Sequence, residues 1–272
     1  MSSFPDDPSL EPLRIDRKPF RSVNTEALYH WQASRPPSWR RLWPDDPLTM
    51  EVLERVARLL RYRCGWRSDA FVPGDKLGIV FFNWEKDSDP DELIMEMEDL
   101  FDVQLPDAAN VFSKTTLDEV VRRIADKPPD FAAIDRDAFA PFSLPADYQR
   151  TGLLHRLVRW LPFYGGDRHH ILDLRERQAR RSRKWREYWP ADGRTQRARA
   201  LVSRVLVDRI GWFDEAFIPD DRMDALLLAK GGAGRTMTAV DELVHLLPGR
   251  IPEPESLPAS KITLGGFIEK LV

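Results

Sequence analysis

An internal repeat constrains this chain more than any other feature of its sequence. Residues 39–75 align without a gap with residues 185–221, at a constant offset of 146, and 16 of the 37 aligned positions are identical. The identical pairs include Trp39 with Trp185, Gly65 with Gly211 and Phe71 with Phe217. A period this long exceeds that of solenoid modules, so each copy is predicted to be a whole small domain with its own core.

Composition places the chain in the soluble globular class and agrees with two domains. It has 272 residues, of which 42% are hydrophobic and 31% are charged. No apolar run approaches the roughly 18 residues that a membrane span needs, and residues 1–16 lack the basic end and apolar core of a signal peptide. We therefore expect a cytoplasmic protein. The single cysteine, Cys64, is expected to be a small buried residue that forms no internal disulfide.

Proline-rich stretches predict the domain limits. Residues 1–24 form an N-terminal arm, expected to be loosely held, and the first repeat covers residues 25–126. Residues 127–159 read as a linker, part of it held by Phe131, Phe139 and Phe142. The second repeat covers residues 160–272.

Hydrophobic periodicity predicts the helices within the first repeat. Thr49 is expected to cap a core helix that ends at Gly65, and Thr116 with Glu119 forms a capping box for the last helix. Between them, the apolar run 77–82 allows either a short strand or a buried turn. The sequence Asp89-Pro-Asp-Glu92 is a helix start. The paired tryptophans at 39 and 43 are interpreted as a packing clamp.

The second repeat is predicted to follow the same order with one change. A core helix spans Thr195–Ile210, and a helix shorter by about a turn begins at a capping box of Thr238 and Asp241. A glycine-rich segment, 231–234, precedes that helix. The segment 229–236 is only remotely like a phosphate-binding loop, because Arg235 stands where that loop needs lysine, so we interpret it as a flexible connection.

Charge is strongly segregated along the chain. Residues 87–107 carry nine acidic side chains and no basic one, whereas residues 175–186 carry seven basic side chains and a single acidic one. The helix after residue 89 is expected to turn four acidic side chains outward: Glu92, Glu96, Asp99 and Asp102. These residues, and Arg180, Arg183 and Lys184 in the basic segment, are the predicted partner-binding residues.

The order of these elements resembles an acyl carrier protein. The residues that carry the resemblance are Phe71, Leu77-Gly78, Asp87-Ser88, the run Glu92–Asp107 and the run Thr115–Val121. The resemblance covers about 75 residues of each copy. It implies a mainly α fold of two tandem acyl-carrier-like helical bundles, with room for short strands in the loop after the first core helix. In that family a serine at the second helix carries 4'-phosphopantetheine, and the acidic second helix docks on basic surfaces of partner enzymes.

The sequence departs from that family at the modified serine. Ser88 follows Asp87, but Asp89-Pro90 replaces the apolar residue, and no Asp-Ser pair exists in the second copy, where Thr236 and Thr238 are the nearest hydroxyls. Both copies are therefore expected to lack the prosthetic group, with Ser88 as the only attachment site to consider. His169-His170 with Asp173 lacks a further ligand at metal spacing, and no base and nucleophile pair can be named.

These observations predict a non-enzymatic protein that binds another protein, with no cofactor and no metal. A role as a bacterial immunity or adaptor protein is compatible with these observations, and the partner is expected to offer a basic docking surface. Two alternatives stay open at this point. One is a true carrier protein modified at Ser88, and the other is a nucleic-acid binder acting through Arg175–Arg186.

Overall fold

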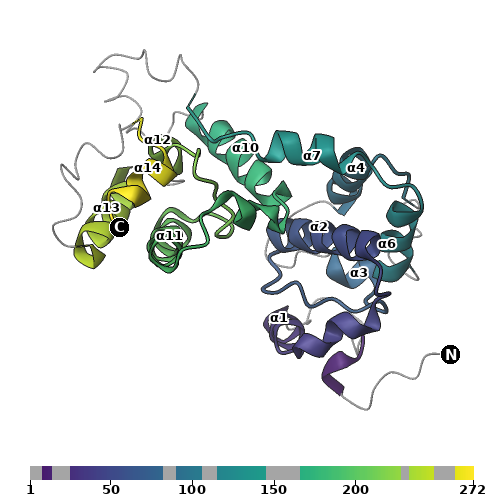
Figure 1. Ribbon diagram of the computed structural model, residues 1–272. Coiled ribbons are helices and arrows are strands. Elements are labelled where there is room, and N and C mark those ends of the chain that lie inside the picture. The colour runs from purple at the N-terminus through teal and green to yellow at the C-terminus, as the bar shows by residue number, and fades with distance from the viewer. Residues whose placement is uncertain are drawn as a thin grey trace. The chain divides into compact units, whose positions relative to one another are not determined.

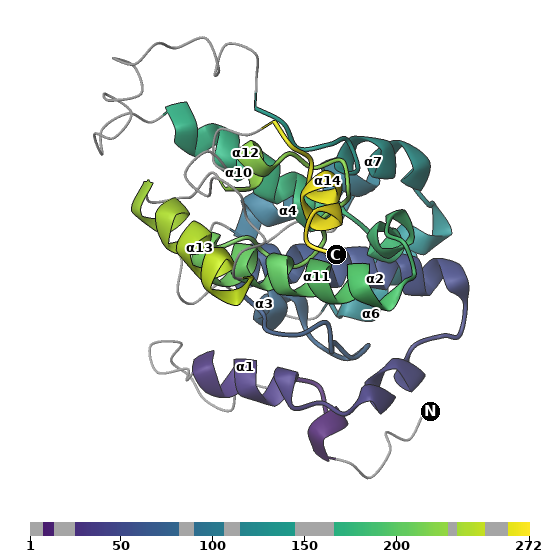
Figure 2. The ribbon, with the colours of Figure 1, turned by 60° about the vertical axis from the view of Figure 1, so that its left-hand side comes forward.

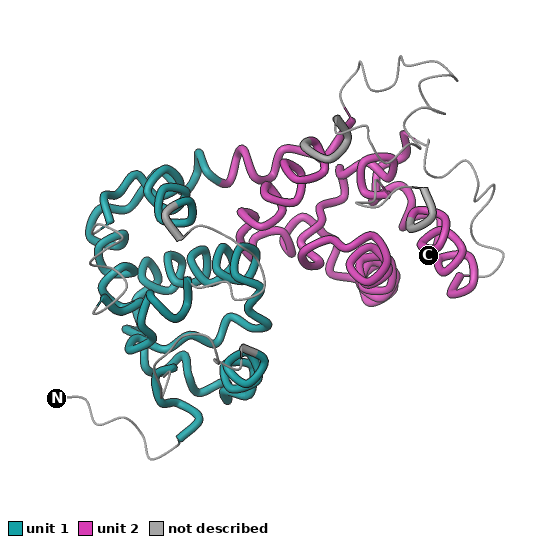
Figure 3. The backbone as a smooth tube through the Cα atoms, turned by 180° about the vertical axis from the view of Figure 1, so that it is seen from behind, with its two compact units in different colours: residues 1–134 teal, residues 135–272 magenta. Residues whose placement is uncertain are grey.

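The computed structural model describes residues 8–13, 25–81, 90–105, 115–144, 166–227, 233–247 and 261–272. These residues are mainly helical and include no β-strand. The chain divides into two compact units, residues 1–134 and 135–272, coloured separately in Figure 3. Each unit is described by itself below.

The two units present their helices in the same order (Figures 1 and 2). The first has η1 (Pro8–Leu10), α1 (Thr25–Ala33), η3 (Pro37–Leu42), α2 (Pro47–Cys64), α3 (Leu77–Val80), α4 (Pro90–Phe101), α6 (Leu117–Asp126) and α7 (Phe131–Ala138), within which the division falls. The second has α10 (Gly166–Arg180), η4 (Arg183–Tyr188), α11 (Gly193–Val205) with its π-helical continuation η5 (Leu206–Ile210), α12 (Met223–Leu226), α13 (Ala233–Leu246) and α14 (Leu264–Glu269).

The central helix of each unit begins at an aspartate. Asp46 accepts hydrogen bonds from the backbone N–H groups of Leu48 and Thr49, and Pro47 occupies the first helical position. Asp192 caps α11 in the same way. The prediction that Thr49 is the cap was therefore wrong by three residues, because the carboxylate three positions earlier already satisfies the free N–H groups. The second core helix likewise begins at Gly193, two residues before the predicted start at Thr195. Gly65 ends α2 with a φ of 75°, as predicted.

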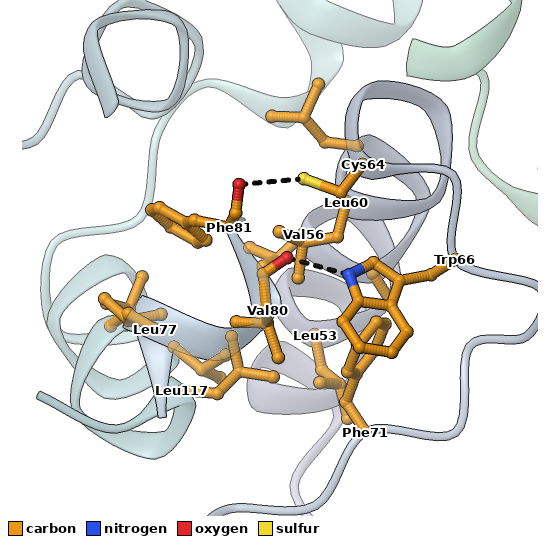
Figure 4. Close-up of a cluster of buried hydrophobic side chains, with 14 of the residues drawn as sticks. Leu53, Val56, Leu60, Cys64, Trp66, Phe71, Leu77, Val80, Phe81 and Leu117 are labelled. Carbon is orange, nitrogen blue, oxygen red and sulfur yellow. Dashed lines mark hydrogen bonds between the residues drawn. The ribbon is translucent and has the colours of Figure 1, made fainter. Parts of the chain in front are cut away.

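The indole ring of Trp66 connects the loop after α2 to the core of the first unit (Figure 4). The Trp66 Nε1 group donates to the carbonyl of Val80 at 2.7 Å, and the Trp66 ring meets Phe71 edge-on with ring centres 5.6 Å apart. The Cys64 thiol is buried and donates to the carbonyl of Phe81. Cys64 is thus the small buried residue that the sequence predicted.

The same contacts recur 146 residues later. Trp212 donates to the carbonyl of Leu226 at 2.7 Å and meets Phe217 edge-on at 5.5 Å. Phe71 and Phe217 are both fully buried. The other tryptophans match as well, since the indoles of Trp43 and Trp189 donate to the carbonyls of Phe71 and Phe217 at 2.8 and 2.7 Å. The tryptophan pairs therefore support the core, as their interpretation as a packing clamp requires.

The apolar run after this loop is helical. Residues 77–80 form α3 and residues 223–226 form α12, so of the two alternatives left open by the sequence, a short strand or a buried turn, the strand is excluded. Extended pairing is limited to one isolated bridge in each unit, Lys76 with Thr116 and Arg222 with Thr263. The predicted capping box of Thr116 and Glu119 is confirmed at the start of α6.

The second repeat does not lose a helical turn. α13 has 14 residues against 12 in α4, and Thr238 lies inside it instead of capping it. The offset of 146 holds here too, because Arg63 pairs with Glu96 and Arg209 pairs with Glu242. The first two glycines of the segment 231–234 lie outside the described residues.

A short segment near the start of each unit is packed into its core. Leu10 and Leu13 are buried, and so are Phe139 and Phe142. Residues 8–13 are therefore held in place, contrary to the expectation of a loose arm, and the predicted linker contributes α7 and two core phenylalanines. The physical reason is apolar side chains within proline-rich sequence, which find a hydrophobic surface to cover.

We predict that Phe71→Ala and Phe217→Ala each lower the free energy of unfolding by about 3–5 kcal/mol, because each removes a fully buried ring beside a tryptophan. Urea denaturation followed by tryptophan fluorescence measures the loss. Met95→Ala, which removes an exposed side chain, is the control and should change stability by less than about 0.5 kcal/mol. Clearly unequal losses at the two phenylalanines would contradict the equivalence of the two cores.

We also predict that acid weakens both central helices through their caps. Hydrogen bonds from the Thr49 side chain and backbone hold the pKa of Asp46 below its usual value, and bonds from Thr195 do the same for Asp192. Because the folded pKa is depressed, protonation favours unfolding, and this stabilisation is lost as pH falls below the ordinary aspartate pKa. A variant with Asp46→Asn and Asp192→Asn should therefore lose less stability between neutral pH and acid than the wild type. Equal losses in thermal melts would contradict this.

Candidate functional site

The most highly bonded polar group of the first unit is a buried ion pair. Arg35 Nη1 lies 2.6 Å from Asp75 Oδ2, Arg35 Nη2 lies 2.8 Å from Oδ1, and both side chains are fully buried. Asp75 also accepts from the backbone N–H groups of Val72 at 2.9 Å and Leu13 at 2.8 Å. One carboxylate thus ties the α1 region, the Phe71 loop and residues 8–13 together.

The second unit repeats this ion pair. Arg181 lies 2.6 and 2.7 Å from the two carboxylate oxygens of Asp221, which also accept from the backbone N–H groups of Ile218 and Phe142. The Arg181 guanidinium stacks on the Phe142 ring at 3.8 Å. Because the pair is fully buried and every carboxylate oxygen accepts two hydrogen bonds, it holds its unit together and offers no group to a substrate. The Arg35–Asp75 and Arg181–Asp221 ion pairs are called the two clamps below.

A glutamine completes the clamp in both units. Gln32 binds the backbone of Ser68 through both ends of its amide, at 2.5 and 3.2 Å. Gln178 binds the carbonyl of Asp214 at 2.8 Å. These glutamines and arginines were not among the predicted functional residues, because they lie outside the aligned stretch that begins at Trp39. The signal was present, since Gln32 and Arg35 match Gln178 and Arg181 at the same offset of 146.

The basic segment 175–186 is largely used within the second unit. Arg181 forms the clamp, and Arg177 donates to the carbonyl of Ala140 at 2.7 Å. Among the predicted partner-binding residues, Arg180 pairs with Glu176 at 2.5 Å and Lys184 pairs with Asp135 at 3.0 Å.

Two further basic residues of this segment differ in their exposure. Arg183 is half-buried, and Arg186 is exposed beside the Trp185 ring. The segment is therefore a structural element of its unit as well as a charged surface.

The acidic residues of α4 divide into a buried one and exposed ones. Glu96 pairs with Arg63, and only 10% of its side chain is exposed, so the prediction that it faces outward was wrong. The physical reason is that Arg63, at the end of α2, reaches the side of α4. Glu92 and Asp99 are exposed, as predicted, and neither has an ion-pair partner within the part of the chain that the structure describes.

An exposed methionine lies between these carboxylates. Met95 is 62% exposed, and it falls at helical spacing with Glu92, Asp99 and Asp102. These four residues are called the acidic stripe below. Asp102 ends α4 with a φ of 47° and lies 4.0 Å from Lys127, with 89% of its side chain exposed. Such an exposed pair at the distance limit contributes little, so the stripe stays largely uncompensated.

The second unit does not repeat the acidic stripe. At the offset of 146, Glu92, Met95 and Asp99 correspond to Thr238, Asp241 and His245 of α13. The buried sides of α4 and α13 correspond closely, since Met97 and Leu243 are both fully buried. The exposed sides of the two helices have therefore diverged while their cores have not.

The remaining candidates give no further site. Ser88 and the side chain of His169 lie outside the described residues. The Thr236 hydroxyl donates to the carbonyl of Leu227 at 2.7 Å. In the described part of the chain, no three metal-binding side chains gather, and no helix is both long and apolar enough to cross a membrane.

Comparison of the chain with protein-family models, curated proteins and solved structures gives no match. The acidic stripe and the two clamps are therefore interpreted from their own chemistry.

We predict that Asp75→Ala and Asp221→Ala each destabilise the protein by about 3–5 kcal/mol, because each leaves a buried guanidinium without its counter-charge. Asp69→Ala is a suitable control, since it breaks a half-exposed pair with Arg61 and should cost about 1 kcal/mol or less. Urea denaturation measures both. A loss at Asp75 no larger than at Asp69 would show that the clamp is not a structural centre.

Proposed function

We propose that the chain is a non-enzymatic protein-binding protein of two acyl-carrier-like units that docks on its partner through the acidic stripe of α4. The observation that carries this proposal is the exposed methionine at the centre of three exposed carboxylates. An apolar centre surrounded by charge is the usual arrangement of a protein docking surface. The partner surface that fits it is basic with an apolar patch at its centre.

The energetics of the stripe support this proposal. Asp99 and Asp102 lie three residues apart, at a spacing where like charges on a helix repel by a few tenths of a kcal/mol. Exposure of Met95 adds a cost that burial against a partner would recover. Neither feature serves the core of the first unit, because the buried side of α4 supplies that core.

The contacts of the other candidate groups favour a binding protein over its rivals. Both buried ion pairs are fully used in holding their units together, so they supply no catalytic base. Five of the seven basic side chains between 175 and 186 bind carbonyls or pair with carboxylates of their own unit, which counts against a phosphate-binding surface there. A bacterial immunity or adaptor protein, which covers a surface of its partner, is the setting we propose.

Charge reversal of the acidic stripe tests this proposal. We expect a variant with Glu92→Lys, Asp99→Lys and Asp102→Lys to lose partner proteins that the wild-type chain captures from cells of its host, because each lysine meets a basic surface. Quantitative mass spectrometry of the captured proteins at low and high salt measures the loss. The control variant, with Asp45→Lys, Glu187→Lys and Asp241→Lys, changes the net charge equally at exposed sites elsewhere.

A partner lost from the stripe variant and kept by the control is the expected result, with thermal stability unchanged in both. Partners captured equally by all three proteins would show that the acidic stripe is not the docking surface.

A further inference from the structure

A second exposed stripe lies on α11 of the second unit. Arg194, Arg197 and Arg204 are exposed, and Leu201 between them is half-buried. Their numbering steps by three, four and three, which places all four on one side of a helix. These residues are called the basic stripe below.

Two arginines of the basic stripe are found in the second unit alone, whereas Arg204 corresponds to Arg58, which is buried in the first unit. Arg194 and Arg197 stand where the first unit has Leu48 and Glu51. Glu51 forms an ion pair with Arg55 on α2, so the first unit neutralises charge where the second adds it. α11 contains four arginines and no acidic residue over its whole length. Within the described residues, none of the three stripe arginines forms an ion pair.

A further arginine of α11 strengthens the positive charge of this helix. Arg199 stands where the first unit has the buried Leu53, and its guanidinium lies 4.7 Å from the centre of the Trp185 ring. Burial lowers the pKa of Arg199, and the neighbouring Arg186 lowers it further, whereas Glu215 raises it. Glu215 supplies an opposite charge here, and Arg199 lies about half a turn around α11 from the basic stripe, so it is not part of that surface.

The two stripes are complementary in spacing as well as in charge. The acidic stripe has its members at steps of three, four and three, with its apolar residue second. The basic stripe has the same steps with its apolar residue third. We infer that the acidic stripe of one copy of this chain docks antiparallel on the basic stripe of a second copy. The pairs are then Glu92 with Arg204, Met95 with Leu201, Asp99 with Arg197 and Asp102 with Arg194.

Only the antiparallel direction matches all four positions. In the parallel direction Met95 would face Arg197 and Asp99 would face Leu201, so the apolar contact and one ion pair would not form. The antiparallel direction also places the N-terminal end of α4 beside the C-terminal end of α11, where the two helix dipoles attract. Helices pair closely enough at 8–10 Å for side chains in these positions to meet.

This inference rests on the proposed docking role of α4 and names its basic partner as a copy of the same chain. The charged residues of both stripes and Met95 are exposed, Leu201 is half-buried, and every copy carries one stripe of each kind. Two copies can exchange both contacts in a closed pair, or successive copies can join into an open chain. One helix pair buries little surface, so the association is expected to be weak and sensitive to salt.

Complementary charge reversal tests the inference. The first variant carries Glu92→Lys, Asp99→Lys and Asp102→Lys, and the second carries Arg194→Glu, Arg197→Glu and Arg204→Glu. We expect the wild-type chain to self-associate with rising concentration at low salt in sedimentation velocity, and each variant alone to stay monomeric. An equimolar mixture of the two variants should associate again, because each reversed stripe then meets its reversed complement.

Disulfide trapping tests the direction and the register. Chains with Met95→Cys, mixed with chains with Leu201→Cys, should form a cross-linked heterodimer under mild oxidation. Met237→Cys, at an exposed position on α13, replaces Leu201→Cys in the control mixture and should not cross-link. Glu92→Cys should cross-link to Arg204→Cys and not to Arg194→Cys.

Three outcomes would overturn the inference. A wild-type chain that stays monomeric at every concentration excludes the contact, and variants that fail to associate when mixed exclude the pairing. A third variant carries both Met95→Cys and Leu201→Cys. If it cross-links only within one chain, while the singly substituted chains do not cross-link to each other, the contact lies inside a single copy. If self-association is absent while the acidic stripe still captures another protein, the proposed function stands and this inference alone fails. If reversing the acidic stripe changes neither self-association nor capture, the proposed function fails as well.

Discussion

The buried ion pair between Arg35 and Asp75, with its counterpart Arg181 and Asp221, is the interaction on which both units depend. Each carboxylate joins the arginine, the loop after the central helix and a short segment near the start of the unit. Removing two charges from water is costly, and it is tolerated here because every lone pair of the carboxylate has a donor. The requirement for that complete set of donors fixes where the separate segments lie.

The repeat divides the molecule into what has been kept and what has changed. The contacts of the interior have been kept: the hydrogen bonds from the indoles of Trp66 and Trp212, the capping aspartates and the two clamps. The exposed sides of two helices have changed: α4 carries carboxylates that α13 lacks, and α11 carries Arg194 and Arg197 where α2 has Leu48 and Glu51. Interiors are close-packed and tolerate few substitutions, whereas exposed positions change at little cost in stability. Divergence of this kind allows two similar units to present opposite charges.

Several features were predictable from local chemistry. The glycine at the end of α2, the capping box at α6 and the apolar sides of the helices each depend on neighbouring residues in the sequence. Two errors share one cause, which is a competing partner. A carboxylate at Asp46 took the capping role predicted for Thr49, and Arg63 from another helix drew Glu96 away from its predicted outward direction.

By itself, the sequence determined that the chain is a helical protein with an internal repeat, and where its charge is concentrated, because periodicity, capping residues and composition are local properties. Tertiary structure alone decided which charges are available. It paired Glu96 with Arg63 and buried Arg181 against Asp221, while it left Glu92, Asp99 and three arginines of α11 exposed, Arg194, Arg197 and Arg204. The physical reason is that the availability of a charge depends on the distance to its nearest counter-charge and on its exposure to water, and both are set by segments far apart in the chain.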